Sequence, residues 1–175
     1  MKRIAIDMDE VMADLIPKHL QLYNENFGEA LTLEDLHGRK LREVRPHAVE
    51  ELRGYLSDPG FFRDLEVMDG AQDVIRELHE DHEIFITTAA MELPTSFNAK
   101  YEWLKEHFSF LNDLNFVFCG DKGIINVDSL IDDNARHFKR FEGTGLLFTS
   151  PHNVHVTGYE RVDSWGDVRE YFLNR

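Results

Sequence analysis

The sequence predicts an α/β protein with a parallel sheet and a helical segment inserted after its first strand. Three observations predict this fold class. An apolar run at residues 4–6 opens the chain as a strand. Stretches with helical periodicity fill residues 15–70 without a strand among them. From residue 71 onward, strand-like runs alternate with helical stretches, and strands joined by such right-handed β-α-β crossovers lie parallel in one sheet.

The segment up to residue 70 is expected to be helical. Gly28 can end its first helix, and Pro17 is tolerated there because it lies near the first turn. The helices expected in this segment are residues 12–27, a helix that starts at Thr32-Leu-Glu-Asp35, and residues 46–55. Turn-forming residues follow at 57–60 and at Asp69-Gly70, where the segment ends.

The remainder of the chain supplies the alternating elements. The expected strands are residues 83–88, 115–118, 129–131 and 145–148. The expected helices are residues 71–80, 94–108, 135–141 and 165–173. In open parallel sheets the working site lies at the carboxyl ends of the strands, so the residues that follow these strands are the functional candidates.

Composition bounds the class of protein. The 175 residues suit one domain with an insertion, and 42% hydrophobic residues are enough to form a core. Thirty-three acids against nineteen bases give a net charge of −14, which excludes a nucleic acid polymer or an anionic membrane surface as partner. The single Cys119 excludes a disulfide framework. No membrane-span-like run or signal peptide is seen, so a cytoplasmic protein is expected.

Polar residues that can act on a phosphate stand at the predicted strand ends. Asp7 and Asp9 are two residues apart, which places both side chains on the same side of a strand. The other candidates are Thr87-Thr88, Lys122 in the loop after residues 115–118, and Asp132-Asp133. Carboxylates crowded at one edge repel one another unless a lysine or a divalent cation offsets them. Oxygen ligands alone suit Mg²⁺.

Each of these residues also has a structural interpretation. Asp7 and Asp9 could be a pair in a strand-end turn, and Thr88 could be an ordinary strand residue with Thr87 as the functional hydroxyl. Lys122, between two glycines, could be a solvated turn residue. One member of Asp132-Asp133 could be the N-cap of the helix expected from Ala135.

Taken in order, these residues resemble the motifs of the haloacid-dehalogenase-like phosphatase superfamily. Asp7-Met-Asp-Glu-Val11 is similar to the first motif, Thr88 to the second, Lys122 to the third and Asp132-Asp133 to the fourth. The resemblance covers nearly the whole chain. It implies a Rossmann-like, three-layer core made of residues 1–14 and 71–175, and a small helical cap made of residues 15–70.

Within that superfamily the chain resembles the 5′(3′)-deoxyribonucleotidase group. That group opens with D-M-D-G-V-L-A-D, and this chain departs from it at Glu10 and Met12. The segment from Pro59-Gly-Phe-Phe62 to Asp69-Gly70-Ala71 is also similar. The group usually has Thr-Ser-Pro as its second motif, whereas this chain has Thr88-Ala89-Ala90, and Asn134 stands where an arginine often follows the last acids. These departures bear on the substrate rather than on the reaction type.

The resemblance implies a reaction mechanism. Asp7 would attack phosphorus to form an aspartyl-phosphate, and Asp9 would protonate the leaving oxygen and then activate water. Mg²⁺ would bind the Asp7 carboxylate, the Asp9 carbonyl and an acid of the Asp132-Asp133 pair, with Asp133 preferred as the direct ligand and Asp132 behind it. Thr88 and Lys122 would bind the phosphoryl group.

The expected function is a Mg²⁺-dependent phosphomonoesterase of (deoxy)ribonucleoside 5′-monophosphates, with a homodimer left open. Phe61 and Phe62 could stack on the nucleobase, or equally could fill the seam between cap and core. Arg39, Lys40 or Arg42 could contact a phosphate or a base edge. The alternatives are a phosphatase of another small phosphoester, such as a sugar phosphate, or a non-catalytic nucleotide-binding domain. The complete carboxylate set speaks against the non-catalytic alternative.

Overall fold

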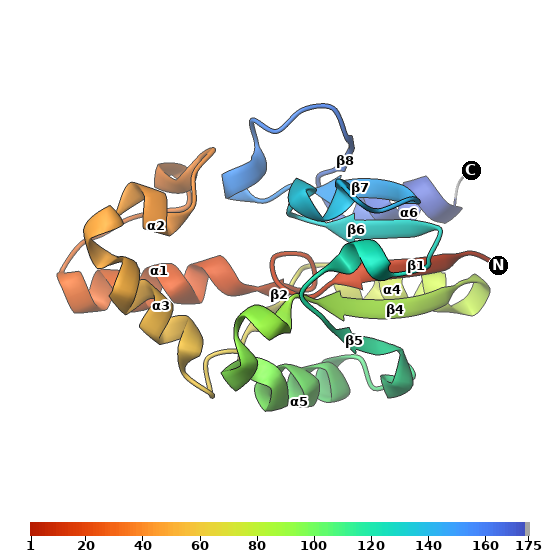
Figure 1. Ribbon diagram of the computed structural model, residues 1–175, viewed down its shortest axis with the longest axis horizontal. Coiled ribbons are helices and arrows are strands. Elements are labelled where there is room, and N and C mark those ends of the chain that lie inside the picture. Colours follow the sequence, from red (N-terminus) through yellow and green to blue (C-terminus); the bar gives the residue numbers. More distant parts are fainter. Residues whose placement is uncertain (174–175) are drawn as a thin grey trace.

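The computed structural model describes residues 1–173 and centres on a six-stranded sheet (Figure 1). The strand order is β5-β4-β1-β6-β7-β8, and every neighbouring pair is parallel. The strands are β1 Arg3–Asp7, β4 Glu83–Thr88, β5 Phe116–Phe118, β6 Ser129–Asp132, β7 Thr144–Phe148 and β8 Glu160–Val162. The predicted α/β class with a parallel sheet is therefore confirmed.

The two faces of the sheet are covered differently. Alternate residues of β1 point to opposite faces, so Ile4 and Ile6 share one face and Ala5 belongs to the other. The helices α4 (Ala71–Asp81), α5 (Phe97–His107) and α6 (Trp165–Leu173) contribute to the core cluster that contains Ile4 and Ile6. The cluster around Ala5 is instead closed by residues of short turns, among them Phe138. Figure 1 shows α4 and α6 behind the sheet.

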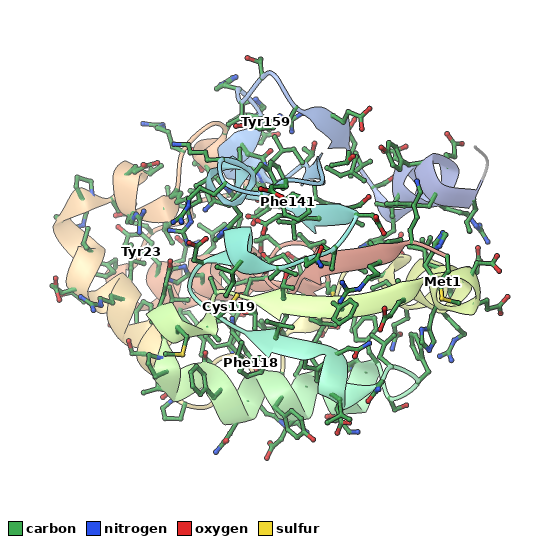
Figure 2. The ribbon with its side chains drawn as sticks, turned by 45° about the vertical axis from the view of Figure 1, so that its right-hand side comes forward. Met1, Tyr23, Phe118, Cys119, Phe141 and Tyr159 are labelled. Carbon is green, nitrogen blue, oxygen red and sulfur yellow. The ribbon has the colours of Figure 1, made fainter. Side chains whose placement is uncertain are left out.

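The residues between β1 and α4 form a separate group of helices beside the carboxyl ends of the strands (Figure 1). Its helices are α1 Leu15–Phe27, α2 Leu41–Val44 and α3 Val49–Ser57. They pack around their own small cluster, in which Tyr23 is fully buried (Figure 2). We call residues 15–70 the cap, and the division of the chain at its two ends stays a prediction.

A two-stranded antiparallel pair marks the place where the chain enters and leaves the cap. It joins β2 (Ala13–Asp14) to β3 (Glu66–Val67). Beside it, Trp165 of α6 donates from Nε1 to the carbonyl oxygen of Val11 at 2.8 Å. Trp103 of α5 donates in the same way to Leu65 at 2.8 Å. Two buried tryptophans thus hold the chain on both sides of the cap against the core.

Several element predictions need correction. The helix expected from residue 12 begins at Leu15, because β2 occupies the residues before it. The helix expected at Thr32 is only a 3-10 turn, and the one expected over 46–55 is a 3-10 turn followed by α3. The helix expected over 135–141 is a 3-10 turn as well, and β8 was not predicted. The 3-10 turns are Glu34–Leu36, Pro46–Ala48, Ala90–Glu92, Pro94–Ser96, Asp113–Asn115, Lys122–Ile124, Ala135–Phe138 and Pro151–Asn153.

Among the described residues, no helix is both long and apolar enough to cross a membrane.

Candidate active site

The structure brings the predicted strand-end residues together around a buried lysine. Asp7 ends β1, Asp132 ends β6, and Lys122 begins the 3-10 turn that follows β5. The Lys122 ammonium donates to Asp7 Oδ1 at 2.5 Å and to Asp132 Oδ2 at 2.6 Å. Lys122 and Asp132 are both 0% exposed. The alternative of a solvated turn residue is therefore wrong for Lys122, which is held inside the site as a counter-ion.

The electrostatics of this group follow from burial. Loss of water raises the pKa of Asp7 to about 7, although the Lys122 charge opposes the shift. Burial alone would lower the pKa of Lys122, but the carboxylates of Asp7 and Asp132 outweigh burial and raise the pKa above its usual value. Lys122 therefore stays charged at neutral pH, and the crowded carboxylates share one fixed positive charge.

Asp133 differs from Asp7 and Asp132 in that its carboxylate has no hydrogen-bond donor among residues 1–173. Ligand oxygens of Asp7, Asp132 and Asp133 all lie within 4.8 Å of one another. Asp132 already accepts from the Asn134 amide at 2.8 Å and from Lys122. His152 Nε2 lies 3.6 Å from Oδ2 of Asp133. Burial raises the pKa of Asp133 well above its usual value, and Asp132 adds to the effect. Lys122 offsets only one of the three carboxylate charges, so this all-oxygen donor set fits a hard cation such as Mg²⁺.

Neither acid of this pair is a helix cap. Asn134 fills that role, because its side-chain oxygen accepts from the backbone amide of Arg136 at 3.3 Å at the start of the turn Ala135–Phe138. The N-cap alternative for Asp132 or Asp133 is therefore wrong. Both carboxylates remain available to the site.

Lys100 is a site residue that the sequence analysis missed. It lies on α5, is 2% exposed, and forms an ion pair with Asp9 Oδ2. Its ammonium also donates to Thr88 Oγ1 at 3.0 Å and lies 4.4 Å from the ring centroid of Phe62. One sequence feature could have revealed it: Lys100 stands four residues before Leu104, on the apolar face of the expected helix. A lysine buried on that face without a partner would be costly, so a partner acid could have been expected.

The two threonines at the end of β4 differ in their partners. Thr88 accepts the hydrogen bond from Lys100, whereas the Thr87 hydroxyl has only a 3.5 Å contact to the carbonyl oxygen of Ile6. Both are fully buried. Thr88 is thus the hydroxyl that contacts the charged group of the site, and phosphate binding by Thr88 stays a prediction. Cys119, which follows β5, is 9% exposed and lies close to that end of the sheet (Figure 2).

A cavity of about 520 Å³ lies between the cap and the core, and Asp133 is the member of the acidic cluster that lines it. About half of its lining residues are aliphatic, and the others include cationic residues from the cap and acids from the core. The polar lining residues are Glu10, His19, Arg39, Lys40, Arg42, Arg53, Glu92, Asp133 and His152. Burial, together with the Lys40 charge, lowers the pKa of His152 to about 4, so its imidazole is neutral at pH 7. Among the described residues that line the cavity there is no Phe, Tyr or Trp.

The stacking role expected for Phe61 and Phe62 needs correction. The two rings are 2% and 1% exposed and belong to the main core cluster, with their centroids 5.0 Å apart. Lys18 and Lys100 cover them with their ammonium groups. No ring face is open to a nucleobase, so the structure supports the other interpretation, a phenylalanine pair in the seam between cap and core. Arg39 does line the cavity, and its contact with substrate stays a prediction.

Comparison with known proteins agrees with this geometry. A family model described as 5′ nucleotidase, deoxy (pyrimidine), cytosolic type C protein matches residues 1–174. A 5′(3′)-deoxyribonucleotidase from Bacillus subtilis is 35% identical over 98% of this chain and 99% of its own length. A Staphylococcus epidermidis protein, provisionally named as a 5′(3′)-deoxyribonucleotidase, is 48% identical over 98% of this chain and 96% of its own.

Solved structures share the fold at low sequence identity. A haloacid dehalogenase family hydrolase from Deinococcus radiodurans, solved with phosphate and sodium, has a TM-score of 0.69 at 11% identity, covering 99% of this chain and 96% of that one. A hydrolase of the same superfamily from Bacillus subtilis, solved with magnesium, has a TM-score of 0.61 at 13% identity and covers 99% of each chain. The motif order, the buried acidic cluster and the full-length family match lead to one conclusion. The chain belongs to the 5′ nucleotidase, deoxy (pyrimidine), cytosolic type C family, and it shares its fold with haloacid-dehalogenase-like hydrolases.

Proposed function

We propose that the protein is a Mg²⁺-dependent phosphatase of (deoxy)ribonucleoside 5′-monophosphates that acts through an aspartyl-phosphate on Asp7. The observation that carries the proposal is the buried Asp7–Lys122–Asp132 group, with the unpaired carboxylate of Asp133 beside it. The names of the relatives support a deoxyribonucleotide as substrate. The family description supports a cytoplasmic enzyme.

The chemistry begins at Asp7. Its carboxylate oxygen would attack phosphorus in line with the leaving oxygen, and the phosphoryl group would pass to Asp7 before water removes it. Lys122 would hold the Asp7 carboxylate in one orientation and offset the charge on the phosphoryl oxygens. Mg²⁺, held by Asp7, Asp133 and the backbone carbonyl of Asp9, would neutralise part of the phosphoryl charge.

Proton transfer would fall to Asp9, and its two oxygens have different surroundings. Lys100 binds Oδ2, while Oδ1 is buried and has no hydrogen-bond partner among the described residues. An oxygen with no other contact can give a proton to the leaving oxygen and later take one from the attacking water. Lys100 and Thr88, which are already hydrogen-bonded to each other, would position this acid against the phosphoryl group.

The cavity beside the cap would receive the leaving group. Its lining supplies aliphatic contacts and four cationic side chains but no aromatic ring among the described residues. A nucleoside would therefore lie against Leu and Ile side chains rather than between stacked rings. The same lining favours a second candidate, a sugar phosphate, whose hydroxyls could bond to the cations without any need for stacking.

A panel of monophosphates tests both candidates. Nucleoside 5′- and 3′-monophosphates, deoxy and ribo, are assayed beside sugar phosphates, each with Mg²⁺ and with EDTA. We expect turnover of nucleotides that requires Mg²⁺ and that Asp7→Asn abolishes. Turnover of sugar phosphates alone would overturn the nucleotide assignment, and nucleotide binding without any hydrolysis would support a binding domain instead.

A further inference from the structure

Glu10 has a backbone conformation that does not suit its side chain. Its φ of +62° makes it the one non-glycine residue of residues 1–173 with a positive φ. Side chains are disfavoured in this left-handed region, whereas glycine, which the resembled group has at this position, adopts it freely. A glutamate that remains in such a conformation is held there by its side-chain contacts.

One oxygen of the Glu10 carboxylate binds the start of the cap. Oε1 accepts from the backbone amides of Leu15 and Ile16, both at 2.8 Å. These are the first two amides of α1, and the N-cap residue Asp14 makes no capping hydrogen bond with its side chain. Glu10 therefore satisfies amides that a helix leaves unpaired at its N-terminus, and its negative charge suits the positive end of the helix dipole.

The other oxygen binds the core. Oε2 accepts from the Ser150 hydroxyl at 3.2 Å, in the loop that follows β7. Ser150 Oγ also lies 3.1 Å from His152 Nδ1, and the far nitrogen of that ring lies 3.6 Å from Asp133. The Glu10 carboxylate is 7% exposed and follows Asp9 in the loop between β1 and β2, which we call the catalytic loop. It thus joins this loop to the first cap helix and to the loop beside Asp133.

We propose that Glu10 is a positioning residue that fixes α1 against the catalytic loop, so that the cap holds the leaving group at a set distance from Asp9. The cavity wall depends on this link, because Leu15, Ile16 and His19 of α1 all line it. The inference rests on the proposed function only in that a leaving group occupies this cavity. Glu10 itself also lines the cavity, and its carboxylate binds Leu15, Ile16 and Ser150 rather than the acids of the site.

The test separates helix positioning from chemistry. Hydrogen exchange at the start of α1 is measured by mass spectrometry in the wild type, Glu10→Gly, Glu10→Gln and the cap surface control Glu50→Gln. Kinetics are measured on the best nucleotide of the panel and on acetyl phosphate, whose leaving group is too small to span the cavity. If the panel shows another phosphoester to be the substrate, that phosphoester replaces the nucleotide.

In Glu10→Gly we expect exchange at Leu15 and Ile16 to rise about tenfold, because the cap is lost. We expect KM for the large substrate to rise about tenfold as well, while kcat/KM for acetyl phosphate changes less than about twofold. Glu10→Gln should restore both properties, because its amide oxygen can accept the same two bonds and its NH₂ group can donate to Ser150. Glu50→Gln should match the wild type.

Three outcomes would overturn the inference: unchanged exchange in Glu10→Gly, equal losses on both substrates, or a Glu10→Gln variant that behaves like Glu10→Gly. If Glu10→Gly does not fold, Glu10→Asn replaces it, because Asn tolerates positive φ and is too short to reach α1. The exchange arm needs no substrate. An inactive wild type would therefore refute the proposed function and would still leave the positioning of α1 to be decided by exchange.

Discussion

The core side and the cap side of the candidate active site treat charge in opposite ways. We use the name core wall for Asp7, Lys100, Lys122, Asp132 and Asp133, of which only Asp133 lines the cavity; both lysines are buried and each binds a carboxylate. The cap wall consists of the cationic residues Arg39, Lys40, Arg42 and Arg53, which are exposed or half-buried. Among the described residues none of these four forms an ion pair. The core wall therefore has one fixed charge arrangement, whereas the cap wall can adapt to what it binds.

The difference has an energetic basis. A charge removed from water must keep its partner, because a buried carboxylate left alone costs several kcal/mol. An exposed arginine remains hydrated and is replaced at little cost to folding. Changes on the core wall should therefore affect both stability and catalysis, and changes on the cap wall should affect substrate binding alone.

The largest effect is expected for Lys122→Met. It leaves the carboxylates of Asp7 and Asp132 buried without a counter-charge, so the free energy of unfolding should fall by about 3–5 kcal/mol at pH 8. Activity should fall by about 10³-fold, as for the loss of a preorganised charge. Urea denaturation and steady-state kinetics measure both, and Lys139→Met, at an exposed position, is the matched control. A Lys122→Met protein with wild-type stability would contradict the fixed-charge description.

An intermediate effect is expected for Lys100→Gln. The substitution removes the ammonium that orients Asp9, so kcat should fall about 10²-fold for a substrate with a poor leaving group. A substrate with an activated leaving group, such as acetyl phosphate, needs no proton and should lose much less. Lys105→Gln on the exposed part of the same helix is the control. Equal losses on both substrates would show that Lys100 does not act through Asp9.

A smaller effect is expected for Arg39→Ala. The residue is exposed, so stability should change by less than about 0.5 kcal/mol. KM should rise about threefold to tenfold with kcat nearly unchanged, because a contact made equally in the ground and transition states is lost. Lys139→Ala is the control, because it removes one positive charge outside the cavity. It shows whether the rise in KM comes from a local contact of Arg39 or from the change in the net charge of the protein. A fall in kcat with constant KM would place Arg39 in the chemistry instead.

The smallest effect concerns His19, which lies inside the cap. Its Nε2 donates to the carbonyl oxygen of Leu52 at 3.1 Å, and burial lowers its pKa below the ordinary value of 6.5. As the pH falls, the unfolded chain therefore binds a proton at His19 before the folded protein does. The contribution of the neutral His19 to stability is complete above pH 6.5 and is lost as the pH falls below 6.5. Between pH 7.5 and 5.5 the free energy of unfolding should therefore fall further in the wild type than in His19→Gln. If urea denaturation shows the same fall in stability for both proteins, the description of His19 as a buried neutral imidazole is contradicted.

The sequence could predict the core wall apart from Lys100, because its other residues end a strand or follow one closely. Apolar runs locate the strands, parallel strands finish at one edge, and Asp7, Lys122 and Asp132 follow from that rule. β8 could not be predicted in this way, since its three residues, Glu-Arg-Val, contain no apolar run. Strands β2 and β3 have two residues each, too few for any periodicity.

Contacts between residues far apart in the sequence could not be predicted either, because no local sequence pattern encodes them. Lys100 meets Asp9 only after α5 has packed on the sheet, and the spacing of 91 residues between them carries no signal. Burial of Phe61 and Phe62 depends on how the end of the cap folds back on the core, which no local pattern encodes. Sequence patterns thus indicated the reacting groups, while the groups that orient them required the structure.

The central claim is that Asp7 of the core wall accepts the phosphoryl group of the substrate. The most direct test mixes the enzyme with Mg²⁺ and a nucleoside 5′-monophosphate labelled at phosphorus, quenches in acid within one turnover, and maps the label on peptides. We predict a labelled peptide that contains Asp7 in the wild type and no label in Asp7→Asn. Label on another residue, or full hydrolysis by Asp7→Asn, would contradict the account.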